Sequence, residues 1–161
     1  MTTAGTGSTT GTGATTGTGA SEDTHGFAAL LIEVMASAQR FGHREHIHLT
    51  WLAVRRYGVP HAVTLVSDGI RRTARYAGAP QKYHATVSRA WVELVGHHAT
   101  QAPGENFAAF TALHPALLDK RLLTRFYRPS TLAAATARTS WVEPDLMPFP
   151  WQDPHSPHEG T

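Results

Sequence analysis

The chain has 161 residues, no cysteine, and a formal net charge of +2 with its histidines neutral. This length fits one domain, and the lack of cysteine excludes disulfides, thiolate metal ligands and cysteine nucleophiles. The small charge is spread over scattered arginines, and no motif of a known nucleic-acid-binding fold is present. We therefore expect nucleic acid not to be a partner.

The opening segment differs in composition from the rest of the chain. Residues 1–22 are nearly all Gly, Thr, Ala and Ser, without a cationic start or an apolar run, so they resemble neither a signal peptide nor a membrane span. Such a segment buries too little apolar surface to offset the entropy of ordering. We predict a disordered tail over 1–22, one helical domain over 23–151 and a flexible tail over 152–161. We expect a cytoplasmic protein that does not bind membranes.

Apolar residues recur at helical spacing between Gly and Pro punctuation, and no window alternates with the period of a strand. The prediction is an all-α fold, a compact bundle of four main helices followed by short helices and an extended Pro-rich tail. The main helices are predicted from Asp23 or Thr24 to about 38, and over 42–57, 61–77 and 81–99.

Shorter helices are predicted over 107–113, 115–126 and 131–138, the last of them capped by Ser130. The prolines after Val142 exclude a further helix, because each removes a backbone donor and restricts the preceding residue. The apolar residues of 141–151 predict that this extended segment packs onto the bundle.

Histidines on two of the predicted helices form the candidate functional site. At 100° per residue, His43 and His46 continue the core-facing stripe of the second helix, whereas His48 and Leu52 fall on the other side. On the fourth helix His84 faces inward, and Thr86 faces away. His98 lies on the same side as His84 but about 21 Å along the helix, too far to share a site.

Residues three apart on a helix are neighbours, so His43 and His46 can reach one ion, and His84 supplies a third imidazole. Three neutral imidazoles suit a divalent transition metal, foremost Zn or Cu, with Fe, Mn or Ni also compatible. Two alternatives stay open: a metal-free polar pocket, and three unrelated core histidines whose ring nitrogens are hydrogen-bonded.

Several neighbours are candidates for a catalytic role. Glu33 offers a carboxylate as ligand or general base, although a solvated helix face is the more common reason for a lone helical glutamate. Lys82 and Tyr83 precede His84 and are placed to donate hydrogen bonds to an anionic substrate or intermediate. Arg138 is expected to pair with Glu143 or Asp145 as a structural tie.

Three motifs carry a resemblance: F-G-H-R-E-H-I-H-L-T-W, K-Y-H-A-T-V-S-R-A-W, and L-L-T-R-F-Y-R-P-S-T-L followed by A-R and E-P-D-L. Over about residues 27–150 the chain resembles a family of small bacterial helical proteins without an established activity. Ser88 departs from the threonine typical of that family. The resemblance implies a self-contained domain and directs attention to His43, His46 and His84.

The functional prediction is a metal-dependent enzyme that acts on a small metabolite, with the metal serving as Lewis acid or activating water or oxygen. The alternative is a non-catalytic helical module that binds a small ligand or a metal.

Overall fold

The structure of the chain is a computed structural model, and it describes residues 16–152. Within this range all regular elements are helices and no strand occurs, which confirms the predicted all-α bundle. In chain order they are α1 (Thr16–Met35), α2 (His43–Tyr57), α3 (Val59–Tyr76), η1 (Pro80–Lys82), α4 (Ala85–Gln101), α5 (Phe107–Leu113), η2 (Pro115–Leu118), η3 (Leu122–Arg125), α6 (Pro129–Ala133) and α7 (Ala135–Thr139).

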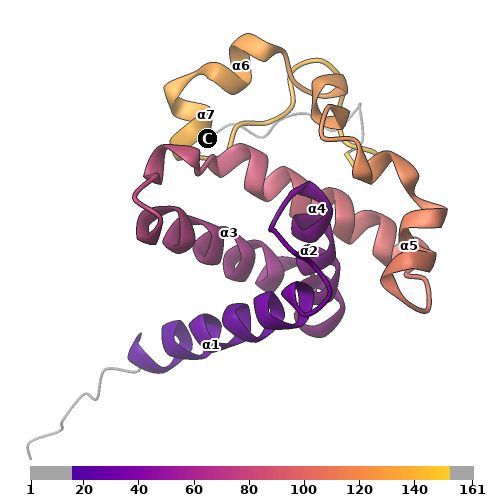
Figure 1. The fold of residues 1–161 in the computed structure, drawn as a ribbon. Helices are drawn as coiled ribbons and strands as arrows, with labels where there is room; N and C mark the ends of the chain where they lie inside the picture. Colours follow the sequence, from indigo (N-terminus) through magenta and orange to yellow (C-terminus); the bar gives the residue numbers. More distant parts are fainter. Residues whose placement is uncertain (1–15, 153–161) are drawn as a thin grey trace, which may run out of the picture.

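Helix α4 is the centre of the bundle. It packs against α2 and α3 on one side and against α7 on the other, while α1 lies across α2 and α3 (Figure 1). Thr86 was predicted to face solvent but is fully buried. Its hydroxyl donates to the Ser140 carbonyl at 2.8 Å and accepts from the Val142 N–H at 3.2 Å. The segment after α7 therefore covers the side of α4 that periodicity alone assigned to solvent.

Helix α2 is surrounded for most of its length. It contacts α1, α3, α4 and η2. Residues 49–54 are all buried, including Leu52, which was predicted to face outward and is 7% exposed. A helix that is buried on every side shows no single apolar stripe, so the helical wheel was a poor guide to this one residue.

The first helix begins earlier than predicted. Helix α1 starts at Thr16, upstream of the expected cap at Asp23 or Thr24, so residues 16–22 of the predicted tail are helical. The Thr24 hydroxyl bonds the Ala20 carbonyl within this helix at 2.7 Å. Because propagation costs much less than nucleation, a helix anchored by its packed part extends into a weakly helical sequence. Residues 1–15 and 153–161 lie outside the described residues, as does most of each predicted tail.

The fourth main helix begins four residues later than predicted. Pro80 opens the short helix η1, and His84 takes extended backbone angles as the N-cap of α4. Lys82, Tyr83 and His84 therefore lie in the connection before α4. A proline is well placed to start a helical turn, which explains why the turn at Pro80 forms separately.

The C-terminal third matches the prediction in part. The helix at 107–113 is found as α5, whereas 115–126 forms η2 and η3, and 131–138 forms parts of α6 and α7. Ser130 lies inside α6 and does not cap it. Among the described residues no side chain caps α6, and the Asp145 carboxylate fixes its start by accepting from the Arg128 N–H and the Thr131 hydroxyl. The segment 141–151 packs onto the bundle as predicted, with Phe149 buried at 1% exposure.

Candidate functional site

Both ring nitrogens of His84 are occupied by the backbone. Nε2 lies 2.7 Å from the Leu132 carbonyl, which can only accept, so Nε2 carries the proton. Nδ1 then accepts from the Val87 N–H at 3.3 Å and caps α4. This arrangement leaves the ring no free lone pair for a metal, and it makes His84 a residue that ties α4 to the C-terminal region.

His43 and His46 are arranged differently. His43 Nε2 donates to the Leu117 carbonyl at 2.9 Å, which leaves Nδ1 with its lone pair in the neutral ring. The Nε2 atom of His46 is buried and has no hydrogen-bond partner among residues 16–152. Burial, and secondly the His43 imidazole, lower the pKa of His46 to about 4. The His46 ring is therefore neutral at physiological pH.

The three predicted metal ligands do not form one set. His43 packs edge-on against Trp91, with ring centroids 4.7 Å apart. Trp91 is seven residues beyond His84, or about 10 Å along α4. Within residues 16–152 no three His, Cys, Asp or Glu side chains are grouped so that they hold one ion. Of the predicted trio, only His43 and His46 are near neighbours.

The predicted catalytic neighbours lie elsewhere. Glu33 forms an ion pair with Arg56 at 2.6 Å, and Arg56 lies at the opposite end of α2 from His43. Lys82 is exposed, and Tyr83 is half-buried. Arg138 was expected to pair with Glu143 or Asp145 but donates to the Gln81 carbonyl.

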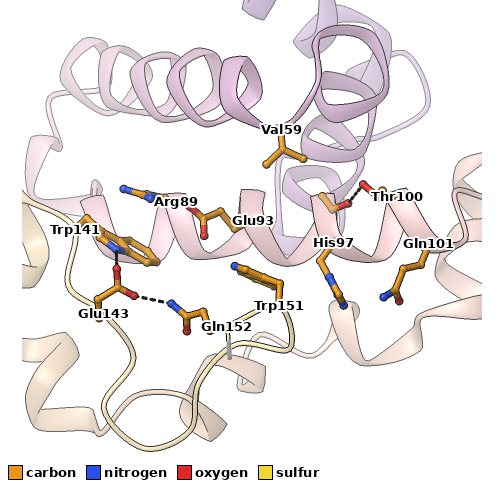
Figure 2. Close-up of a pocket in the computed structure, with 11 residues that line it drawn as sticks. Val59, Arg89, Glu93, His97, Thr100, Gln101, Trp141, Glu143, Trp151 and Gln152 are labelled. Carbon is orange, nitrogen blue, oxygen red and sulfur yellow. Dashed lines mark hydrogen bonds and ion pairs between the residues drawn. The ribbon is translucent and has the colours of Figure 1, made fainter. Parts of the chain in front are cut away.

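A cavity of about 670 Å³ lies between α4 and the segment after α7, and we call it the tryptophan pocket. Figure 2 shows Trp141 and Trp151 standing over the face of α4 that carries Arg89, Glu93 and His97. The full lining comprises Val59, Arg89, Glu93, Gly96, His97, Thr100, Gln101, Trp141, Glu143, Trp151 and Gln152.

Polar contacts hold the pocket walls in place. Glu143 accepts from the Trp141 indole at 2.7 Å and from the Gln152 amide at 2.8 Å (Figure 2). Arg89 bonds Glu93 at 2.6 Å and lies over the Trp141 ring, 4.3 Å from its centroid. One wall therefore joins residues of α4 to residues some fifty positions later in the chain.

The aromatic side chains of the C-terminal segment pack against one another and against the pocket residue His97. Trp151 stacks on buried Phe149 with ring centroids 4.7 Å apart, and it packs against His97 at 5.2 Å. Tyr127 is fully buried nearby and donates to the Val142 carbonyl at 2.8 Å. Burial, and secondly Glu143, raise the pKa of the Tyr127 phenol well above its ordinary value. Tyr127 is therefore a protonated structural donor at neutral pH.

Sequence reasoning missed this pocket. The segment that contains Trp141 was expected to pack onto the bundle, but nothing in the spacing of Arg89, Glu93 and Trp141 indicated that they meet. The alternation of indoles with carboxylates and amides in 141–152 was the available signal. It indicates a surface suited to binding as much as to packing.

Comparisons of the chain with protein-family models, with curated proteins and with solved structures found no match. Among the helices of residues 16–152, none combines the length and the apolar character needed to cross a bilayer.

Proposed function

We propose that this chain is a small-molecule-binding helical domain whose ligand occupies the tryptophan pocket. The observation that carries the proposal is a cavity of about 670 Å³ lined by two indoles and a few fixed polar groups. Ligand pockets in proteins are typically about 300–1,000 Å³, with an aromatic lining and a small number of oriented polar side chains.

The charges of the lining favour a neutral or cationic ligand. The carboxylate of Glu93 is matched by Arg89, whereas Glu143 adds a second negative charge. The exposed indole of Trp151 offers a face for an apolar, planar or cationic group. A polar organic molecule with one such face matches both features of the pocket.

The same pocket contains residue types that perform acid–base chemistry. Glu93 and His97 present a carboxylate and an imidazole to the cavity (Figure 2). Turnover of a bound small metabolite is therefore compatible with the pocket, and enzymatic activity stays a prediction.

Ligand-observed NMR with a panel of neutral and cationic metabolites tests the binding proposal. We expect at least one saturable ligand, and we expect Trp151→Ala to weaken its binding by about tenfold or more, since stacking on an aromatic face contributes on the order of 1–3 kcal/mol. Met147→Ala is the matched control, because Met147 lies on the same segment, is half-exposed and does not line the pocket. Equal loss in both variants, or no ligand from the panel, contradicts the proposal.

A second candidate function is metal-dependent chemistry at His43 and His46. The observation that favours it is the buried, unpartnered His46 Nε2, since a buried polar atom without a partner costs about 1–3 kcal/mol. His43 donates its other ring N–H to a backbone carbonyl, the arrangement found around metal-bound histidines. Zn or Cu, or else Fe, Mn or Ni, would be held by two imidazoles and completed by water or substrate.

Elemental analysis of tag-free protein, purified and then reconstituted with each of these metals and desalted, tests the second candidate. We expect near-stoichiometric metal that is lost in His43→Ala and His46→Ala. His84→Ala is the matched control and retains the metal, because both ring nitrogens of His84 are already bonded. No retained metal, or equal loss in all three variants, contradicts a site at His43 and His46.

A further inference from the structure

A second pocket has a different chemistry from the tryptophan pocket. It lies where the end of α3, η1 and α7 meet, has a volume of about 340 Å³, and is called here the arginine pocket. Its lining comprises Arg71, Arg75, Pro80, Gln81, Tyr83, Arg138 and Thr139, and none of these residues carries a carboxylate.

Two of its arginines come from consecutive turns of one helix. Arg71 and Arg75 are four residues apart on α3, where side chains are neighbours and like charges repel each other. Asp68 offsets part of this charge, because its carboxylate lies 3.1 Å from Arg71. The lining therefore keeps an excess of positive charge.

The third arginine arrives from a distant part of the chain. Arg138 belongs to α7, more than sixty residues after Arg75, and its guanidinium is held against the pocket by a hydrogen bond to the Gln81 carbonyl. Three arginines thus line one small hollow, where their like charges repel one another and a bound anion would reduce that repulsion.

Tyr83 adds a neutral donor to the same lining. Its side chain is half-buried, and burial raises the pKa of its phenol above the ordinary value. The phenol is therefore protonated at neutral pH and available as a hydrogen-bond donor. Tyr83 was singled out from the sequence as a donor to an anionic group, and it lines the pocket where the arginines gather.

We propose that the arginine pocket binds the phosphoryl group of a small molecule. Guanidinium groups donate paired, planar hydrogen bonds that match phosphate oxygens, and three of them suit a multiply charged group better than a single carboxylate. A volume of about 340 Å³ lies at the small end of ligand pockets, which fits a phosphoryl group with a short attached portion and not a long polymer.

An NMR titration with inorganic phosphate and pyrophosphate, at constant ionic strength balanced with sodium chloride, tests this proposal. We expect saturable shifts of the Nε–H signals of Arg71, Arg75 and Arg138, with pyrophosphate binding more tightly than phosphate. Arg75→Gln and Arg138→Gln should each weaken binding about tenfold or more, because a charge-assisted hydrogen bond contributes on that order.

Arg40→Gln is the matched control, because it removes the same charge from an exposed arginine in the connection between α1 and α2. Circular dichroism verifies that each variant is folded. If Arg138→Gln unfolds, Arg75→Gln still decides the question, since Arg75 is exposed and its substitution removes only a surface charge. Non-saturable shifts, equal loss in Arg40→Gln, or binding seen only with oligonucleotides and strengthening with their length would each overturn the proposal.

Discussion

The stability of this protein should depend on pH through His46. The pKa of His46 is lowered from 6.5 to about 4, first by burial and secondly by His43. Above pH 6.5 the ring is neutral in both states and its full contribution to stability is present. As the pH falls from 6.5 towards 4, His46 binds a proton in the unfolded chain but stays neutral in the folded chain, so the free energy of unfolding decreases. Below pH 4 the folded ring is protonated too, and the loss ends.

The expected magnitude follows from the size of this shift. At about 1.4 kcal/mol per pKa unit, the whole shift corresponds to about 3 kcal/mol. Between pH 7.5 and pH 4.5 the lost part is about 2.5 kcal/mol, since the folded ring begins to protonate near the lower limit. With ordinary urea m-values, the unfolding midpoint should fall by on the order of 1–2 M because of this one group.

Urea unfolding, followed by circular dichroism at pH 7.5, 6.5, 5.5 and 4.5 in the presence of a chelator, measures the effect. His46→Gln lacks the titrating ring, so its midpoint should fall less than that of the wild type by the stated amount. The control is His25→Gln, which removes an exposed histidine from α1 and should follow the wild-type profile. His98 also has a pKa lowered by burial, so the comparison between variants isolates His46. Parallel profiles for wild type and His46→Gln would refute the reasoning.

Three further predictions concern packing and capping, and thermal or urea unfolding checks each of them. Gly69→Ala should destabilise the fold by about 1–3 kcal/mol, because its Cβ would lie 2.0 Å from the Phe27 ring between α3 and α1. Gly19→Ala has open space around the new Cβ and should stabilise the fold. A Gly69→Ala variant more stable than Gly19→Ala would contradict the packing of α3 on α1. Tyr127→Phe should cost about 1–2 kcal/mol, since it leaves a backbone carbonyl without its donor; an unchanged midpoint would show that water replaces the bond. His84→Ala should lower the free energy of unfolding by a similar amount, because it removes the cap of α4 and the bond to the Leu132 carbonyl. A loss of bound ligand or metal without a loss of stability would contradict a structural role for His84.

The helical architecture could be predicted because its signals are local. Gly58 takes a φ of 79° and ends α2 at the predicted position, and Pro60 falls in the first turn of α3. The start of α5 follows equally from Asn106, the N-cap whose side chain accepts from the Ala109 N–H. Caps, prolines and apolar spacing act over a few residues, so the sequence alone contains their effect.

The inward direction of His43 and His46 was also accessible to periodicity, because both lie on a regular helix. Periodicity does not indicate which group a ring nitrogen bonds. The Leu117 carbonyl that fixes the His43 tautomer lies 74 positions away, and the Leu132 carbonyl that occupies His84 lies 48 positions away. The backbone contacts that separate His84 from the other two histidines are therefore tertiary.

Residue types and short-range order were determined by the sequence itself: the absence of thiols, the all-α fold class of residues 16–152 and the inward direction of His43 and His46 follow from residue type and spacing. The tertiary structure alone decided which groups share a site. Arg89 lies over Trp141, and Arg138 lines a pocket with Arg75, only because the last third of the chain folds back over α4 and the end of α3. Such contacts depend on the sum of many weak packing interactions across the whole domain, and no local pattern specifies them.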